Sequence, residues 1–562
     1  MRLRLVSVSA LAVAFIAVVT PPADAQRVLG VGDDALVLPR GVFRFRTLGQ
    51  WTSFNERYGM DTPGRPDGAL EPLGIDFTLD TIGVKQFPDL ASLQSGIQQL
   101  TGNASWFATL GNTKVTLRDQ VTAFPFVFEA GITKRFSIGI QVPYVRTNAS
   151  VSLNVNTTGI EGNLGFNPAA FGNTTAAAQN AAMLSQFTAD STSLKNALDN
   201  CQANPAAPGC PQLNAQRTAA TSLITLATAF ARGVNSIFSA SPFVPIVGTD
   251  AQLTLEARVA AFKAAYANFA PFGVPPITSS GPFASQTRLT VTDAQRVLTE
   301  TGFGIVAEPL ASVGRSHLGD IDIGGKFAVY DSFDGSTEAR MSPHGLNFRT
   351  AVGGIVRLPT GQAESPNNLV DIGTGRGVAA LEGRWFGDLL VGSHFWQSFV
   401  VRFNKPFADK HEMRIIDLPD EELAPVYRRQ TVDRQLGSAF EFETTPRIVL
   451  NDFFAVSGQY VYRRKNQDHY RGKFTIPTAL TGLPAPLDID AATLDLETET
   501  REHRFGGGIS FSNLYSFDKG KAKIPFEATY LHWQTTKGSG GNQPKFFTDQ
   551  IQVRLYARIF GK

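Results

Sequence analysis

Cysteine, charge and histidine are all scarce in this chain of 562 residues. The 2 cysteines are too few for a disulfide scaffold or a four-cysteine zinc site. Charged residues make up 18%, against about 25% in ordinary soluble domains. Lysine and arginine (51) nearly balance aspartate and glutamate (49), which excludes the basic stripe of a nucleic-acid-binding protein. The 52 glycines and 42 phenylalanines that are present leave two classes, a large exported β-rich protein or a membrane β-barrel.

Long apolar runs are also missing, apart from one at the N terminus. Residues 5–19 are apolar, two arginines precede them, and an Ala-Asp-Ala tripeptide ending at Ala25 follows. This order is typical of a secretory signal peptide, whereas a membrane anchor needs about 20 apolar residues. The sequence therefore predicts a signal peptide over 1–25 and a mature chain over 26–562.

Apolar residues recur with the period of two that indicates β-strands. After a tight turn at 133–135, for example, Phe136, Ile138 and Ile140 alternate with serine, glycine and glutamine. The pattern predicts twelve strands, over 42–54, 121–132, 136–149, 318–331, 346–358, 376–386, 389–403, 436–446, 452–465, 498–511, 523–536 and 546–560.

The links between these strands differ in length according to their order. Those after even-numbered strands are short, namely 133–135, 332–345, 387–388, 447–451 and 512–522. Those after odd-numbered strands are mostly long, namely 55–120, 150–317, 359–375, 404–435, 466–497 and, as the brief exception, 537–545. Even strand number and alternating link length are typical of an outer-membrane barrel. We therefore predict an all-β, antiparallel transmembrane barrel of about 12 strands with both termini periplasmic.

Charged residues of the strands share one parity, opposite to the apolar residues. They are Arg44, Arg46, Glu129, Asp320, Asp322, Lys326, Arg349, Arg357, Glu382, Arg384, Arg402, Glu441, Glu443, Arg463, Glu502, Arg504, Glu527, Arg554 and Arg558. A lysine or arginine facing lipid near the midplane costs roughly 2–4 kcal/mol, so this parity is predicted to line the lumen. Within it, Asp320, Asp322 and Lys326 are expected to form a salt-bridge row. Trp396 and Val400 fall on the same parity, which leaves strand 389–403 ambiguous or bulged.

Two interpretations of the lumen stay open at this point: the charges either line a polar pore or bridge one another across a closed barrel. A soluble barrel with an apolar core, which is a separate alternative, would show the same alternation. Residues 26–41, which precede the first strand, are few for a plug. In the membrane interpretation the partners are outer-membrane lipid and, during biogenesis, the barrel-assembly machinery.

The insertion over 150–317 differs from the rest of the chain. It is rich in Ala, Asn, Thr and Ser and predicts helices near 174–199, 213–238 and 250–269. Both cysteines lie in it, and in an oxidising compartment Cys201 and Cys210 are expected to close a small loop by a disulfide. Topology makes the insertion a largely helical extracellular subdomain, although it could also fold into the lumen as a plug.

Three stretches resemble the outer-membrane proteins grouped under the meta-pathway of phenol degradation. They are FEAGITKRFSIGIQVPYV at 128–145, LGDIDIGGKFAVY at 318–330 and LNFRTAVGGIVRLPTGQAESPNN at 346–368. The resemblance covers about half of the mature chain and departs from the family at 150–317. It implies an outer-membrane barrel that gives small hydrophobic or aromatic molecules a passive route.

Catalytic, cofactor and metal motifs are not found in the sequence. Ser316 and His317, next to Asp320, could suggest a catalytic triad, but adjacent residues on a strand point to opposite faces, so the two side chains are poorly placed to bond. The leading hypothesis is a monomeric outer-membrane channel for an unidentified small solute, without enzyme activity, cofactor, metal or nucleic-acid partner. The alternative is a surface-binding or adhesion protein in which the barrel anchors residues 150–317.

Overall fold

A computed structural model describes most of the mature chain. The described residues are 32–59, 66–88, 90–158, 161–279, 281, 283–333, 343–419, 421 and 423–558. The predicted signal peptide and its cleavage site lie outside the described residues.

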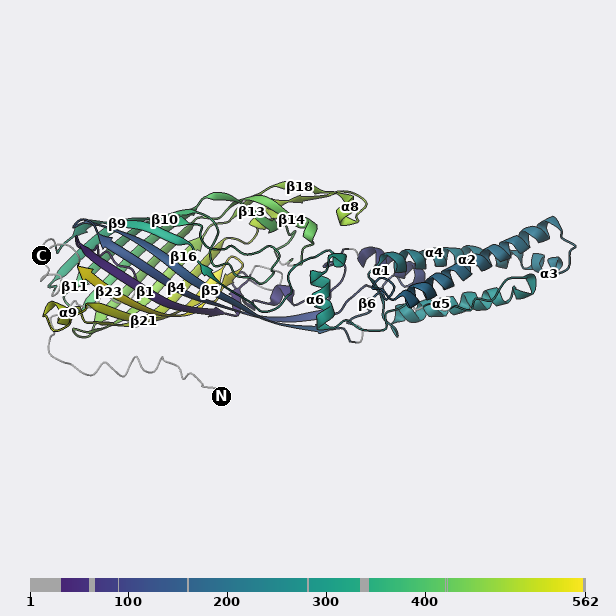
Figure 1. The fold of residues 1–562 in the computed structure, drawn as a ribbon, viewed down its shortest axis with the longest axis horizontal. Helices are drawn as coiled ribbons and strands as arrows, with labels where there is room; N and C mark the ends of the chain where they lie inside the picture. Colours follow the sequence, from purple (N-terminus) through teal and green to yellow (C-terminus); the bar gives the residue numbers. More distant parts are fainter. Residues whose placement is uncertain are drawn as a thin grey trace, which may run out of the picture.

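Twelve antiparallel strands close into a barrel (Figure 1), as the sequence predicted. They are β1 (Val42–Phe54), β4 (Asn112–Gly131), β5 (Phe136–Asn156), β9 (Ile321–Asp331), β10 (Leu346–Leu358), β11 (Ala380–Val391), β12 (Phe395–Pro406), β15 (Ala439–Val449), β16 (Phe454–Lys465), β20 (Thr500–Ser512), β21 (Phe526–Ser539) and β23 (Phe547–Arg558). The first strand pairs with the last, Val42 opposite Arg558. Closure leaves no unpaired edge along the barrel wall.

Alternation along the strands separates two chemically different faces. On β1, Phe45 and Trp51 are 39% and 42% exposed on the outer face, while Arg44, which has the opposite parity, is buried. Outer residues of neighbouring strands contact one another, since the Phe45 and Phe126 rings stack across β1 and β4. The apolar face therefore points out of the barrel and the polar face into it, and a soluble barrel would have the reverse order.

The two ends of the barrel differ in their links. At the end we call the short-turn end, the strands connect through 132–135, 332–345, 392–394, 450–453 and 513–525. At the long-loop end the links are 55–111, 157–320, 359–379, 407–438, 466–499 and 540–546. Links after odd-numbered strands are the long ones, so all long segments lie at one end of the barrel.

One turn lies elsewhere than the sequence predicted. The expected break at 387–388 is continuous strand, and the turn occupies 392–394, where Gly392 has a φ of 56° that favours glycine. The register of β11 with β12 is regular, with Val400 opposite Phe386. Trp396 and Val400 therefore need no bulge, because both point into the lumen, where they are fully buried.

Strands β4 and β5 extend well beyond the predicted bounds and form a long ribbon. Near the short-turn end β5 pairs with β9, and farther along it pairs with an additional strand, β8 (Val313–Leu318). Gly319 and Asp320 separate β8 from β9. The predicted strand over 318–331 is thus the second part of an interrupted strand.

The insertion projects away from the long-loop end instead of entering the lumen (Figure 1). Its main helices are α2 (Thr174–Ala203), α3 (Cys210–Ala215), α4 (Arg217–Ala240), α5 (Asp250–Ala267) and α6 (Val291–Thr299), with short 3-10 turns at Ala270–Phe272 and Thr301–Phe303 and the short pair β6 (Leu164–Phe166) and β7 (Phe243–Pro245). The first long loop joins it through α1 (Leu90–Thr101), whose buried Ile97 belongs to the same apolar core as Phe187 and Leu194 of α2. The subdomain therefore has two separate chain segments around one core.

Smaller elements complete the long-loop end. They are β2 (Glu56–Tyr58), β3 (Leu70–Pro72), β13 (Ala408–Arg414), β14 (Arg429–Gln435), β17 (His469–Arg471), β18 (Lys473–Ile476), α8 (Thr478–Thr481), β19 (Leu487–Asp490), β22 (Gln543–Pro544) and the 3-10 turns Ile75–Phe77, Val426–Arg428 and Ala491–Asp495, while α9 (Leu514–Asp518) lies in a link at the short-turn end. Among the described residues, none of the helices is both long enough and apolar enough to span a membrane.

Candidate functional site: the barrel lumen

Residues 32–38, which precede β1, run inside the barrel. Gly41 donates its N–H to the carbonyl of Gly131 at the short-turn end, and residues 32–38, which we call the luminal segment, continue into the lumen. Ala35 donates its N–H to Asp388 Oδ2 (3.0 Å), and Lys326 Nζ donates to the carbonyl of Asp34 (2.6 Å). The expectation that this part is too short for a plug is wrong, because seven residues suffice to cross the lumen of a twelve-strand barrel.

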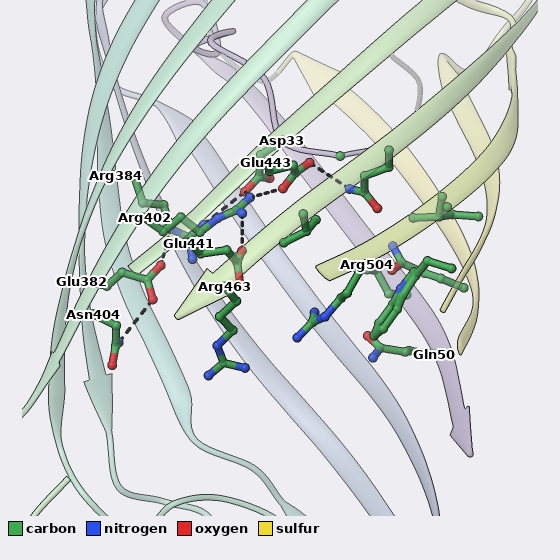
Figure 2. A pocket seen from close by; sticks show the side chains of 18 of the residues that line it. Asp33, Gln50, Glu382, Arg384, Arg402, Asn404, Glu441, Glu443, Arg463 and Arg504 are labelled. Carbon is green, nitrogen blue, oxygen red and sulfur yellow. Dashed lines mark hydrogen bonds and ion pairs between the residues drawn. The ribbon is translucent and has the colours of Figure 1, made fainter. Parts of the chain in front are cut away.

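Apolar contacts and ion pairs both hold the luminal segment. Ala35 and Val37 pack against Phe386 and Val400 of the barrel wall. Asp33 lies among the arginines of three strands, with Oδ2 at 3.0 Å from Arg402 and 3.3 Å from Arg384, and Oδ1 at 3.8 Å from Arg46 (Figure 2). A carboxylate shared by several guanidinium groups is well compensated for its burial.

Below the luminal segment, towards the short-turn end, the lumen is filled with side chains. Trp396 is sandwiched between the guanidinium groups of Arg349 (4.7 Å) and Arg447 (4.2 Å). Arg349 also donates to Asp388 (2.8 Å), whose other oxygen accepts from Ser398 (2.9 Å). All five of these residues are at most 5% exposed. In this conformation the barrel is closed at this level.

The charged residues predicted for the lumen are mostly joined in ion pairs. Pairs across neighbouring strands are Arg44 with Glu129 (2.6 Å), Arg349 with Asp388 (2.8 Å), Arg357 with Asp322 (2.8 Å), Arg402 with Glu441 (2.5 Å) and Glu443 (2.7 Å), and Arg554 with Glu527 (3.6 Å). Pairs within one strand are Arg384 with Glu382 (2.5 Å) on β11 and Arg504 with Glu502 (2.6 Å) on β20. The facing positions follow from strand register, for instance Arg44 opposite Glu129. The wall is thus cross-linked by charge on its inner side.

The predicted salt-bridge row of Asp320, Asp322 and Lys326 does not form. Asp320 lies in the break between β8 and β9, where its carboxylate accepts the N–H groups of Gly361 (3.0 Å) and Arg376 (2.9 Å). Lys326 instead binds the luminal segment and lies 4.0 Å from the Phe386 ring. Parity along a strand predicts the face on which a charged side chain lies, but it does not specify which partner that side chain binds.

The structure adds lumen residues that the sequence did not predict. Asp388 and Arg447 have the parity of Glu382 and Glu441, but they fall in the predicted turns 387–388 and 447–451, where the structure continues both strands. Asp33 lies outside every predicted strand, so no periodic signal marks it. The predicted strand 376–386 began at Arg376, but β11 begins at Ala380, so Arg376 lies in the preceding loop and reaches the lumen from there.

An open cavity of about 500 Å³ lies on the long-loop side of the luminal segment. Seven arginines and four carboxylates line it, so three positive charges are in excess. Its floor includes Asp33 and Gly32, and its wall also carries Trp533, Leu531 and Val461. The cavity is the part of the lumen with room for a solute.

His317 and Asp320, which lie close together in the sequence, do not contact each other. His317 Nδ1 lies 3.0 Å from the backbone oxygen of Leu318, while the Asp320 carboxylate is engaged by backbone N–H groups. In the part of the chain that the structure describes, no cluster of three His, Cys, Asp or Glu residues is placed to hold a metal ion.

The two cysteines lie at the far tip of the insertion. A disulfide joins Cys201, near the end of α2, to Cys210, the first residue of α3. Both are buried. The bond closes the turn that reverses the chain direction between the long helices.

Comparison with known proteins gives distant structural likeness only. No protein-family model and no curated protein matches the chain. An outer membrane channel from Pseudomonas putida F1 is 8% identical, covering 94% of this chain and 99% of that one, with a TM-score of 0.40. The Pseudomonas putida toluene transporter TodX is 8% identical (96% and 99% covered, TM-score 0.23), and a Pseudomonas aeruginosa FadL homologue is 6% identical (92% and 91%, TM-score 0.24).

Likeness at these values carries no argument about what the chain does. The barrel fold rests on the strand pairing itself, and the resemblance to the phenol meta-pathway proteins stays a prediction. The geometry and charge of the lumen are the features that bear on function.

Proposed function

We propose that the protein is an outer-membrane channel that lets small solutes pass by diffusion. One observation carries the proposal: a closed barrel holds a polar cavity of about 500 Å³ inside a wall whose outer face is apolar. Large apolar side chains are exposed on β1, β4, β5, β9, β10, β11, β12, β15, β16, β20, β21 and β23. A continuous apolar belt of this extent needs a lipid environment.

The lining of the cavity favours a polar or charged solute over a neutral hydrocarbon. Arginines and carboxylates contribute most of its charged surface, and apolar groups occupy one sector. Ring-like arrangements of fixed charge select permeating solutes by charge. The family resemblance, in contrast, implies hydrophobic or aromatic molecules, and an aromatic solute that carries a charge satisfies both.

The luminal segment, together with the Trp396, Arg349 and Arg447 side chains packed below it, closes the barrel in this conformation, and it is the element that has to move for passage. It is held at Asp33 by three arginines and at Asp34 and Ala35 by Lys326 and Asp388. A deletion of residues 32–38 should therefore raise conductance in planar lipid bilayers above that of the intact protein. A deletion of 478–482, at the tip of an external lobe, is the matched control and should leave conductance unchanged.

Conductance of the intact protein and of the two deletion variants in lipid bilayers tests the channel function. If neither the intact protein nor the variant lacking 32–38 passes ions, the channel function is wrong. If both variants conduct more than the intact protein, the increase reflects general loosening of the barrel and not release of the luminal segment.

A second function is favoured by the shape of the insertion. Helix α2 has 30 residues, which corresponds to about 45 Å at 1.5 Å per residue, and it projects from the barrel with α4 and α5 (Figure 1). Such a projection would present a binding surface away from the membrane. Removing 160–305 separates the roles, because a channel keeps its conductance without this part, whereas an adhesive protein loses the projecting helices that bind.

A further inference from the structure

Two of the seven cavity arginines have no acidic partner within the part of the chain that the structure describes. Arg46, Arg357, Arg384, Arg402 and Arg504 each have a carboxylate oxygen within 3.8 Å. The guanidinium groups of Arg376 and Arg463 have none, although both residues line the cavity. Figure 2 shows the Arg463 side chain extended beside Glu441, with no dashed line reaching it.

The carboxylates nearest to Arg463 are already used by other groups. Strand register places Arg463 opposite Glu441 on one side and Glu502 on the other. Glu441 accepts from Arg402 (2.5 Å). Glu502 accepts from Arg504 (2.6 Å) and from the Thr535 hydroxyl (2.7 Å). Both oxygens of Glu502 and one oxygen of Glu441 are therefore engaged by other groups. Among the described residues no carboxylate forms an ion pair with Arg463, so its guanidinium group can bind a ligand in the cavity.

The backbone of Arg376 is fixed while its side chain is not engaged. Its N–H donates to Asp320 Oδ2 (2.9 Å), and its carbonyl accepts from Arg434 (3.3 Å). The loop that carries Arg376 is thus tied to the β8–β9 break at one face and to β14 at the other. A guanidinium presented from a fixed backbone is a pre-organised anion ligand.

The charges of this corner repel one another. Burial, together with the neighbouring guanidinium groups of Arg463 and Arg357, lowers the pKa of Arg376 to about 10. Arg357 is paired with Asp322 (2.8 Å), and Asp468 and Asp320 partly offset the repulsion at Arg376. Arg376 and Arg463 are thus two like charges close together without an ion-pair partner among the described residues. An anion bound there removes the repulsion and accepts charge-assisted hydrogen bonds from both guanidinium groups.

An apolar sector adjoins the arginines. Val461, Leu531 and Trp533 line the same cavity, and the Arg504 guanidinium lies 4.7 Å from the Trp533 ring. Arg504 lies over the Trp533 ring, so the apolar contact open to a ligand ring is with Val461, Leu531 and the part of Trp533 that lines the cavity. The volume admits a ligand larger than an inorganic ion. An anion with an apolar, flat body therefore fits better than phosphate or chloride.

We propose that Arg376 and Arg463 bind the carboxylate of a small aromatic acid in this cavity, with the ring of the acid against the Val461, Leu531 and Trp533 sector. The inference deepens the proposed channel function, because it names the class of solute that the lumen accepts. It also assigns a role to two arginines that the ion-pair network of the wall leaves out.

Binding can be measured on the full-length protein in detergent, without any conductance. Benzoate, monitored by calorimetry and by quenching of tryptophan fluorescence, should bind the intact protein, whereas benzyl alcohol, its neutral analogue, and acetate, which lacks the ring, should bind at least tenfold more weakly. Arg376→Gln and Arg463→Gln should each weaken benzoate binding at least tenfold, and Arg463→Lys should restore part of it. Arg464→Gln changes the adjacent, outward arginine and should have no effect.

The outcomes separate this inference from the channel function. Equal benzoate affinity in the intact protein and in the double variant R376Q/R463Q would overturn the site, provided that both proteins show the same heat-dependent shift in electrophoretic mobility of a folded barrel. Phosphate binding as tight as benzoate binding would overturn the aromatic class. A protein that conducts without binding benzoate refutes only this inference, and one that binds benzoate but never conducts refutes only the channel.

Discussion

At the scale of single residues, Arg414 on β13 shows how the external lobes are joined. Its guanidinium is buried, 8% exposed, and donates to the carbonyls of Pro366 (2.7 Å), Ile305 (2.7 Å), Ala424 (2.7 Å) and Val306 (2.9 Å). Those carbonyls come from three loops that are far apart in the sequence. Only a planar group with five donors can satisfy them together.

Replacing Arg414 by lysine should loosen the external lobes and leave the barrel intact. A lysine ammonium donates from a single point, so at least two buried carbonyls lose their partners, at a cost of about 1–3 kcal/mol each. We expect faster proteolysis of loop 407–438 and a lower melting temperature of the external part. Lys410→Met, on the same strand but with its side chain 77% exposed, is the control; equal proteolysis of both variants would contradict the role of Arg414.

At the scale of elements, helix α2 shows an apolar face interrupted by one acid. Met183, Phe187, Leu194 and Leu198 are buried at helical spacing, and Asp190 lies among them with 2% exposure. Burial raises the pKa of Asp190, and its Oδ2 has no hydrogen-bond partner among the described residues. The helix is therefore more stable with a neutral side chain at this position.

The charge of Asp190 makes the stability of the helical subdomain depend on pH. Because its pKa is higher in the folded state, the protonated carboxyl stabilises folding at low pH, and this contribution is lost as the pH rises through the raised pKa. Asp190→Asn should therefore increase the melting temperature by roughly 2–4 °C at pH 8 and hardly at all at pH 4, as followed by circular dichroism at 222 nm.

The control for this experiment is Asp199→Asn. Asp199 lies on the same helix, is exposed and pairs with Lys195 (2.7 Å), so its replacement should not raise the melting temperature. A pH-independent gain in the Asp190 variant would show that packing, and not charge, is responsible.

At the scale of the whole molecule, the two ends of the barrel face different compartments in the proposed orientation. The helical insertion and the lobe of β18, α8 and β19 lie at the long-loop end, and the turn 132–135 lies at the short-turn end (Figure 1). The native cysteines are joined in a disulfide, so cysteines introduced elsewhere are the reactive ones.

Single-cysteine labelling of intact cells tests this orientation. Leu226 on α4 and Leu480 on α8 are 60% and 65% exposed, and we expect cysteines at both positions to react with a membrane-impermeant maleimide. Lys134→Cys, also exposed but in a short turn, should react only after lysis. Labelling of position 134 in intact cells, with positions 226 and 480 protected, would reverse the topology.

The sequence by itself determined the barrel, because alternation of side chains is a local property of an extended chain. A period of two assigns Arg44, Glu129 or Arg384 to the inner face without reference to any other strand, and link length assigns each loop to an end. The same information placed helices near 174–199 and 250–269 and brought the two cysteines close together.

Only the tertiary structure decided which charges meet and what fills the lumen. Asp33 and the rest of the luminal segment carry no periodic signal, and Arg376 reaches the cavity from a loop. Lys326 and Asp320 were assigned to one face yet bind different segments: Lys326 binds Asp34, 292 residues away, and Asp320 binds Arg376, 56 residues away. Local pattern fixes the face on which a side chain lies, whereas closure of the barrel fixes its neighbours, and the proposed solute site depends on those neighbours.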